Sequence, residues 1–150
     1  MGKVELRVDQ DPAHVRVVRL VSTAVGRMAG LGDEALDEVR LGVSEACGLA
    51  IDALDAAGSD APMSLEFDDT LGLQVTVRTP AALPERQQVP VPADPATEDT
   101  PHTAHVLLDR LALIEGLIDD VDVESGPEGS SLTMRWKPGN GAAPRREELR

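Results

Sequence analysis

Residues 40–51 read Arg-Leu-Gly-Val-Ser-Glu-Ala-Cys-Gly-Leu-Ala-Ile, inside a longer helical pattern that runs from Asp33 to Gly58. Asp33 is a typical helix N-cap and Gly58 a typical terminator, so we predict one helix between them. Its apolar side chains form a narrow stripe at helical spacing: Leu36, Val39, Val43, Cys47, Ala50 and Leu54. Such a stripe is typical of a helix that packs one face on a core. Glu45 lies off this stripe.

The rest of the chain divides into strand and helix patterns around this helix. Alternating apolar and polar side chains predict strands at residues 4–8, 63–68, 71–78, 121–125 and 131–136. Residues 12–28 and 105–118 read as helices, and the first presents an apolar stripe that includes Val18, Val25 and Met28. Residues 79–103 contain six prolines and read as a long mobile loop. This order predicts an α+β fold, a two-layer sandwich with helices on one face of a sheet.

Composition narrows the functional classes. The formal net charge is −13, from 27 acidic and 14 basic side chains. This charge argues against direct binding to nucleic acid, and it favours a basic partner or plain solubility. One cysteine excludes a disulfide framework, and no metal site is expected. No apolar run approaches the length of a membrane helix and no signal peptide is apparent, so we expect a cytoplasmic protein without membrane association.

Two segments resemble a known family. Residues 40–51 are similar to the second helix of the anti-sigma factor/serine kinase family, within the GHKL (Bergerat-fold, histidine-kinase-like) ATPases. Residues 110–123 resemble that family's passage from a Leu-rich helix into a strand. The resemblance implies a mostly antiparallel mixed sheet with helices on one face, as one domain over residues 1–137. Residues 138–150 are expected to form a disordered tail.

The sequence departs from this family at three nucleotide-binding elements. The resemblance makes Glu45 a general base, but the position of the magnesium-binding asparagine one turn later is Leu49. An alkyl side chain cannot ligate a hard cation. The family's Asp-x-Gly-x-Gly box is replaced by the sequence that follows Arg78, and a phosphate-binding glycine is replaced by Arg110. We therefore expect no cofactor, with ATP and Mg²⁺ bound only if the family site is retained. Some anti-sigma factors of high-GC, actinobacterial type have similarly degenerate boxes, which agrees with the composition.

Several side chains remain open to two interpretations. Glu45 is either a vestigial general base or a solvated helix carboxylate. Leu41 and Leu49 either fill the vacated pocket or join an interface. On the first helix, the resemblance places a sigma-factor contact at Arg16, with Arg19 one turn away, whereas the plainer interpretation is a solvated helix face. The run of apolar residues there is wider than one stripe needs, so we predict that Val17 and Leu20 are partly left over for a partner.

The resemblance implies an anti-sigma factor that sequesters an alternative sigma factor, as in stress responses. A STAS-type anti-anti-sigma factor would relieve it, and the protein would be a homodimer through its first helix. The alternative is an ATP-dependent serine kinase that phosphorylates the STAS antagonist. A third interpretation is a scaffold that binds only the STAS protein.

Overall fold

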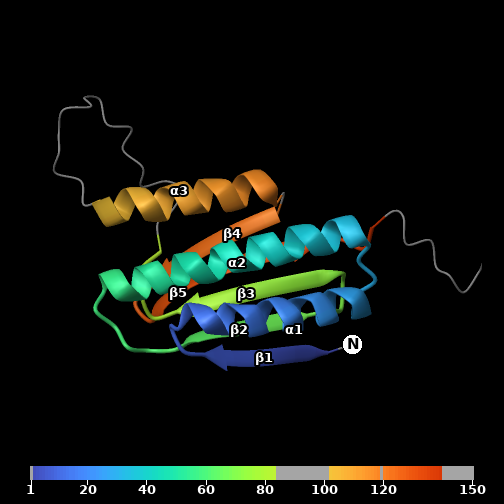
Figure 1. Cartoon of the computed structure of the whole chain (residues 1–150), viewed down its shortest axis with the longest axis horizontal. Coiled ribbons are helices and arrows are strands. Elements are labelled where there is room, and N and C mark those ends of the chain that lie inside the picture. The colour runs from blue at the N-terminus through green and yellow to red at the C-terminus, as the bar shows by residue number, and fades with distance from the viewer. Residues whose placement is uncertain (1, 84–101, 119, 140–150) are drawn as a thin grey trace, which may run out of the picture.

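The computed structural model describes residues 2–83, 102–118 and 120–139 of the 150-residue chain (Figure 1). The elements are β1 (Lys3–Val8), a 3₁₀ turn (Pro12–His14), α1 (Val15–Met28), α2 (Asp33–Ala56), β2 (Met63–Asp68), β3 (Leu73–Thr79), α3 (His102–Leu117), β4 (Asp120–Gly126) and β5 (Gly129–Trp136). Helix α3 thus begins one turn before the expected start at His105. The loop expected over residues 79–103 lies mostly outside the described residues, as does the expected tail from residue 140 onward.

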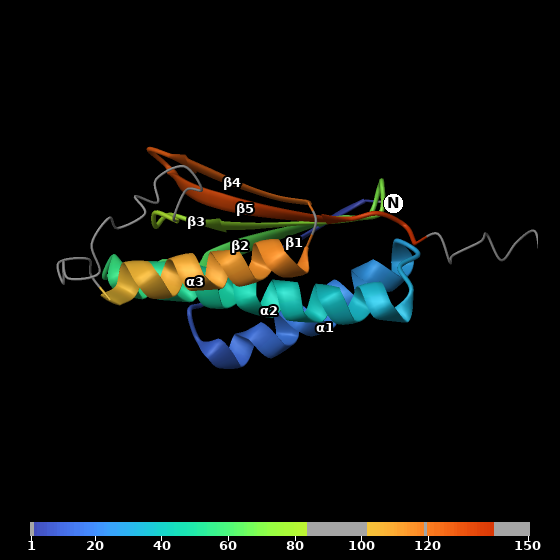
Figure 2. The same ribbon diagram turned by 90° about the horizontal axis from the view of Figure 1, so that it is seen from above.

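The five strands form one sheet in the order β1-β2-β3-β5-β4. Figure 2 shows the three helices on a single face of this sheet, which confirms the two-layer α+β fold. All four strand pairings in the described ranges are antiparallel, so the sheet is antiparallel throughout rather than mixed. None of the helices in these ranges combines the length and the apolarity needed to cross a membrane.

Apolar side chains run across the whole sheet in register. One row crosses all five strands and consists of Leu6, Leu65, Val77, Leu132 and Val123. A second row, two residues along each strand, consists of Val4, Phe67, Val75, Met134 and Val121. Because side chains alternate between the faces of a strand, these rows line the side that the helices cover. The alternation of apolar and polar residues that predicted the strands therefore reflects one core face that all five strands share.

Helix α1 begins after a capped 3₁₀ turn. The Asp11 carboxylate accepts a hydrogen bond of 2.9 Å from the Ala13 backbone N–H. Val18 and Val25 are buried as expected, but Met28 is 72% exposed, so its assignment to the core stripe was wrong. Each helical residue turns the chain by about 100°, and the stripe through Val18 and Val25 continues at Ala29 rather than at Met28.

Helix α2 lies in the middle of the helical layer and packs against both α1 and α3 (Figure 1). The predicted stripe from Leu36 to Leu54 is buried. Burial also includes residues outside that stripe, namely Gly42, Ala46, Leu49, Ile51 and Ala53, so the stripe is not narrow. The N-cap is Gly32, and Asp33 is instead the first helical residue, where its charge favours the helix N-terminus.

Candidate functional site

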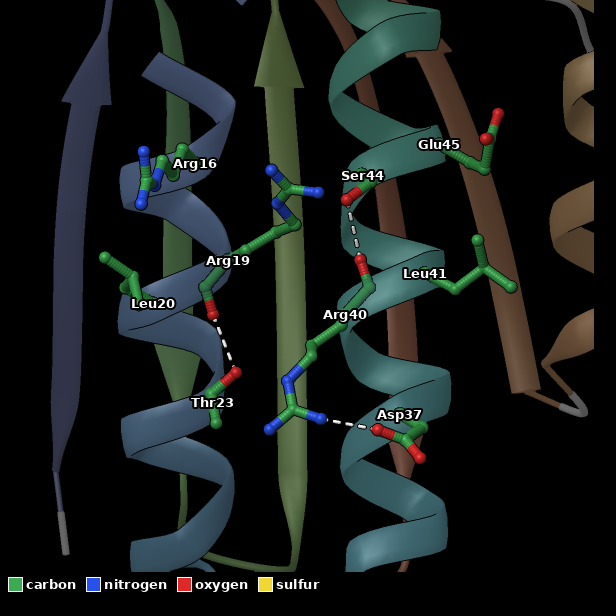
Figure 3. Close-up of a pocket in the computed structure, with 9 residues that line it drawn as sticks. All are labelled: Arg16, Arg19, Leu20, Thr23, Asp37, Arg40, Leu41, Ser44 and Glu45. Atoms are coloured by element: carbon green, nitrogen blue, oxygen red, sulfur yellow. Dashed lines mark hydrogen bonds and ion pairs between the residues drawn. The ribbon is translucent and has the colours of Figure 1, made fainter. Parts of the chain in front are cut away.

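A shallow groove of about 600 Å³ lies between α1 and α2, on the side of the helical layer away from the sheet. The residues that line it are Arg16, Arg19, Leu20, Thr23, Asp37, Arg40, Leu41, Ser44 and Glu45 (Figure 3). Three residues singled out as partner contacts in the sequence, Arg16, Arg19 and Leu20, line this groove from α1, and Glu45 of the motif lines it from α2. Helical spacing places Arg16 and Arg19 one turn apart on α1.

The groove contains guanidinium groups that have no partner in the described part of the chain. Neither Arg16 nor Arg19 makes a side-chain hydrogen bond or ion pair there, and both side chains are exposed. Arg40 is different because its guanidinium pairs with Asp37 on the same helix. Arg16 and Arg19 are therefore the charges of this groove that remain available to a ligand of opposite charge.

The hydroxyl groups of the groove are already engaged within their own helices. The Thr23 hydroxyl donates to the Arg19 carbonyl at 2.8 Å, and the Ser44 hydroxyl donates to the Arg40 carbonyl at 2.7 Å. Because each hydroxyl already donates its proton to the preceding turn of its own helix, it has no proton left to donate to a partner. The polar chemistry that the groove offers to a partner is therefore mainly that of its arginines.

Exposed leucines give the groove an apolar component. Leu20 on α1 is 65% exposed and Leu41 on α2 is 47% exposed. Leu49 is fully buried, so of the two leucines considered for the vacated pocket, Leu49 fills the core whereas Leu41 lines the groove. Val17 is also exposed, but it lines a separate hollow of about 250 Å³ beside the end of β1 and does not belong to the groove.

Glu45 points from α2 towards α3 rather than towards α1 (Figure 3). Its carboxylate lies 3.9 Å from the Arg110 guanidinium, which also forms a 3.1 Å ion pair with Asp52. Arg110 was noted in the sequence only as the replacement of a glycine, and its contact with Glu45 was missed. A separation of 65 positions in the chain leaves no local sequence signal for such a pair.

Among the described residues, the other reactive groups do not form a site. Cys47 is buried in the core, and burial raises the pKa of its thiol to about 12. A thiol with this pKa is a poor nucleophile at neutral pH, because the thiolate is the reactive form. Within the described ranges, no three His, Cys, Asp or Glu side chains gather closely enough to hold a metal ion.

Comparison with known families agrees with this architecture. A family profile described as a histidine kinase-like ATPase domain matches residues 8–136, from the end of β1 to the end of β5. The chain belongs to this family. The match extends over every helix and strand from α1 onward, so the groove and the Glu45–Arg110 contact both lie inside a histidine kinase-like ATPase domain. A search of curated proteins finds no match to the chain.

Proposed function

We propose that this histidine kinase-like ATPase domain is an anti-sigma factor. It sequesters an alternative sigma factor in the cytoplasm, and a STAS-type anti-anti-sigma factor relieves it. The observation that carries the proposal is the pair of exposed arginines, Arg16 and Arg19, which have no ion-pair partner among the described residues and lie beside the exposed Leu20 in one groove. Arginine next to exposed apolar side chains is a common composition for the anchor of a protein interface. The resemblance of residues 40–51 to the anti-sigma factor family supports the same assignment.

We also propose that the protein holds no MgATP tightly. The position that the resemblance assigns to a metal-binding asparagine is Leu49, whose alkyl side chain is fully buried and offers no oxygen to Mg²⁺. Glu45 already faces a guanidinium. After β3, Ala81 and Leu83 are buried, where the family has a glycine-rich box. These residues do not fit a magnesium nucleotide, so regulation through phosphorylation by this chain is not expected.

The proposed assembly is a homodimer through α1. Five of its residues, Val17, Leu20, Val21, Ala24 and Met28, lie on one side of the helix at spacings of three and four. Val17, Leu20, Ala24 and Met28 are exposed, and Val21 is partly buried. This second apolar stripe is separate from the face that α1 buries against the core, and it resembles the seam of two packed helices. No nucleic-acid partner is proposed, because the net charge is −13.

The test is co-purification followed by calorimetry. The chain is expressed with the sigma factors and STAS proteins encoded near its gene, and captured partners are identified by mass spectrometry. A sigma factor that binds in the absence of nucleotide supports the proposal. Capture of a STAS protein alone supports the scaffold interpretation. Binding of ATP with a micromolar Kd, together with phosphate transfer to the STAS protein, would instead establish the serine kinase.

A further inference from the structure

The Arg110 side chain crosses from α3 to α2 and lies over Gly48. Its Nε is 3.1 Å from an Asp52 carboxylate oxygen, and its Nη1 is 3.9 Å from a Glu45 carboxylate oxygen. Glu45 and Asp52 are seven residues apart, which places them two turns apart on one face of α2. Gly48 lies between them, so one guanidinium bridges two carboxylates across a residue that has no side chain.

Gly48 provides the space that this bridge needs. A Cβ atom added at this position would overlap with Nη1 of Arg110 and would lie 2.9 Å from its Cζ. No backbone atom is among these nearest neighbours; all three belong to the guanidinium of Arg110. A methyl group at position 48 would therefore displace the guanidinium without moving either helix, because the end of an arginine side chain is flexible.

Helix α3 lies at the edge of the helical layer. It lies at one end of the helical layer, beside α2 and over β4, with α1 on the far side of α2 (Figure 1). Leu111 and Ile114 of α3, together with Ile118 directly after it, are buried and attach the helix to the core. Apolar contacts are non-directional, whereas a guanidinium held by two carboxylates fixes an orientation. The bridge therefore adds a directional constraint to a helix at the edge of the layer.

We propose that Arg110 is a positioning residue that latches α3 onto α2 through Glu45 and Asp52. In the latched arrangement the Glu45 carboxylate is turned towards α3 and faces the Arg110 guanidinium, rather than pointing towards Arg16 and Arg19 on α1. The latch is a property of the free chain, and it does not rest on the identity of the partner. It requires no nucleotide, because both carboxylates and the guanidinium belong to the protein.

The latch acts on local opening more than on global stability. The side chains of Arg110, Glu45 and Asp52 are 36%, 26% and 31% exposed, and ion pairs that are this accessible to water contribute modestly to stability. A helix at the edge of a layer opens at a lower cost than the core, so a modest contact there alters amide exchange first. The relevant measurement is hydrogen exchange of the α3 backbone between residues 110 and 117.

The experiment compares Arg110→Ala, Gly48→Ala and a matched control in the whole chain. Both variants are expected to raise α3 amide exchange about three- to tenfold. Gly48→Ala keeps every charge, and alanine favours a helix more than glycine does. The unfolding midpoint of Gly48→Ala is therefore expected to equal or exceed that of the wild type, while the amides of α3 exchange faster. The control is Arg135→Ala, which removes a similar arginine bridge to Asp120 and Asp122 on the sheet and is expected to leave α3 unchanged.

Two further readouts separate a latch from a general loss of packing. Exchange of α3 in the wild type is expected to quicken with ionic strength, and this salt dependence is expected to vanish in Arg110→Ala. The double variant Gly48→Ala/Arg110→Ala is expected to exchange no faster than Arg110→Ala alone, since both changes remove one interaction. Unchanged α3 exchange in both folded single variants, or additive effects in the double variant, would overturn the proposal.

Discussion

The Ile118 side chain occupies the space beside Gly42 that any other residue at position 42 would need. A Cβ atom added to Gly42 would overlap with Cδ1 of Ile118 and would lie 3.4 Å from Cζ2 of Trp136. Gly42 is on α2, Ile118 directly follows α3 and Trp136 ends β5. The glycine of the motif thus lets two helices and the sheet meet at one point.

We expect Gly42→Val to reduce the free energy of unfolding by about 1–3 kcal/mol, the usual cost of overpacking a core. Chemical denaturation monitored by circular dichroism measures this change. Gly116→Val is the matched control, because a Cβ atom at Gly116 meets nothing within 4 Å. The control is expected to be neutral or slightly stabilising, since valine favours a helix somewhat more than glycine. If the two substitutions changed the free energy of unfolding equally, the contact between Gly42 and Ile118 would not be the reason why position 42 requires a glycine.

Restoring the motif asparagine is expected to destabilise the protein without restoring a nucleotide site. Leu49→Asn places an amide in a fully buried position, and an unpaired buried amide costs about 1–3 kcal/mol in addition to the lost apolar burial. Leu41→Asn is the control on the same helix, and its exposed position predicts a change within about 0.5 kcal/mol. Thermal denaturation with and without millimolar MgATP measures both effects, and a clear rise in Tm with MgATP would contradict the expectation.

The Cys47 thiol is expected to react slowly with alkylating reagents in the folded protein. Its ionisation is also expected to lower the free energy of unfolding at high pH. Burial raises its pKa from about 9.0 to about 12, so only the unfolded state releases the thiol proton between these values. The contribution of this group to stability is therefore intact below pH 9 and is lost as the pH rises towards 12. Iodoacetamide labelling at neutral pH is expected to require denaturant. Cys47→Ala removes this part of the pH dependence, and an unchanged profile would contradict the assignment.

The elements of the fold were largely predictable because each has its own periodicity. The apolar rows through Leu65 and Phe67 follow a period of two along each strand, and Val39 to Leu54 follow a helical period. The breadth of burial on α2 was not predictable in this way. Leu49 is buried because α2 lies between two other helices over the sheet, and that arrangement is set by tertiary packing rather than by local pattern.

The sequence predicted some residues of the groove between α1 and α2, but it did not predict the contact of Arg110 with Glu45 and Asp52. The excess of apolar residues on the first helix pointed to Leu20, which is exposed in the groove. Val17 came from the same reasoning but lies in another hollow, because three residues along a helix change the direction of a side chain by about 60°. Arg110 meets Glu45 only after α3 packs on α2, so no spacing in the sequence indicated their contact.

The last prediction separates partner binding from residual catalysis. Arg16→Ala is expected to weaken sigma-factor binding by about 1–3 kcal/mol, the range for an interface anchor, and to leave the fold intact because the Arg16 side chain is exposed. Arg27→Ala is the matched control, since Arg27 is an exposed arginine of the same helix outside the groove. Glu45→Gln removes the carboxylate charge at nearly constant shape and is expected to leave binding nearly unchanged.

Calorimetric titration with the sigma factor identified by co-purification measures the affinity of all three variants, and circular dichroism checks that each is folded. If the protein only binds the sigma factor and Glu45 is not catalytic, Arg16→Ala is the only one of the three variants that loses affinity. A kinase shows the reverse, because removal of its general base stops phosphate transfer while the arginine substitution has little effect. If Glu45→Gln abolishes regulation and Arg16→Ala is silent, the motif glutamate is still catalytic and the anti-sigma proposal without ATP is wrong.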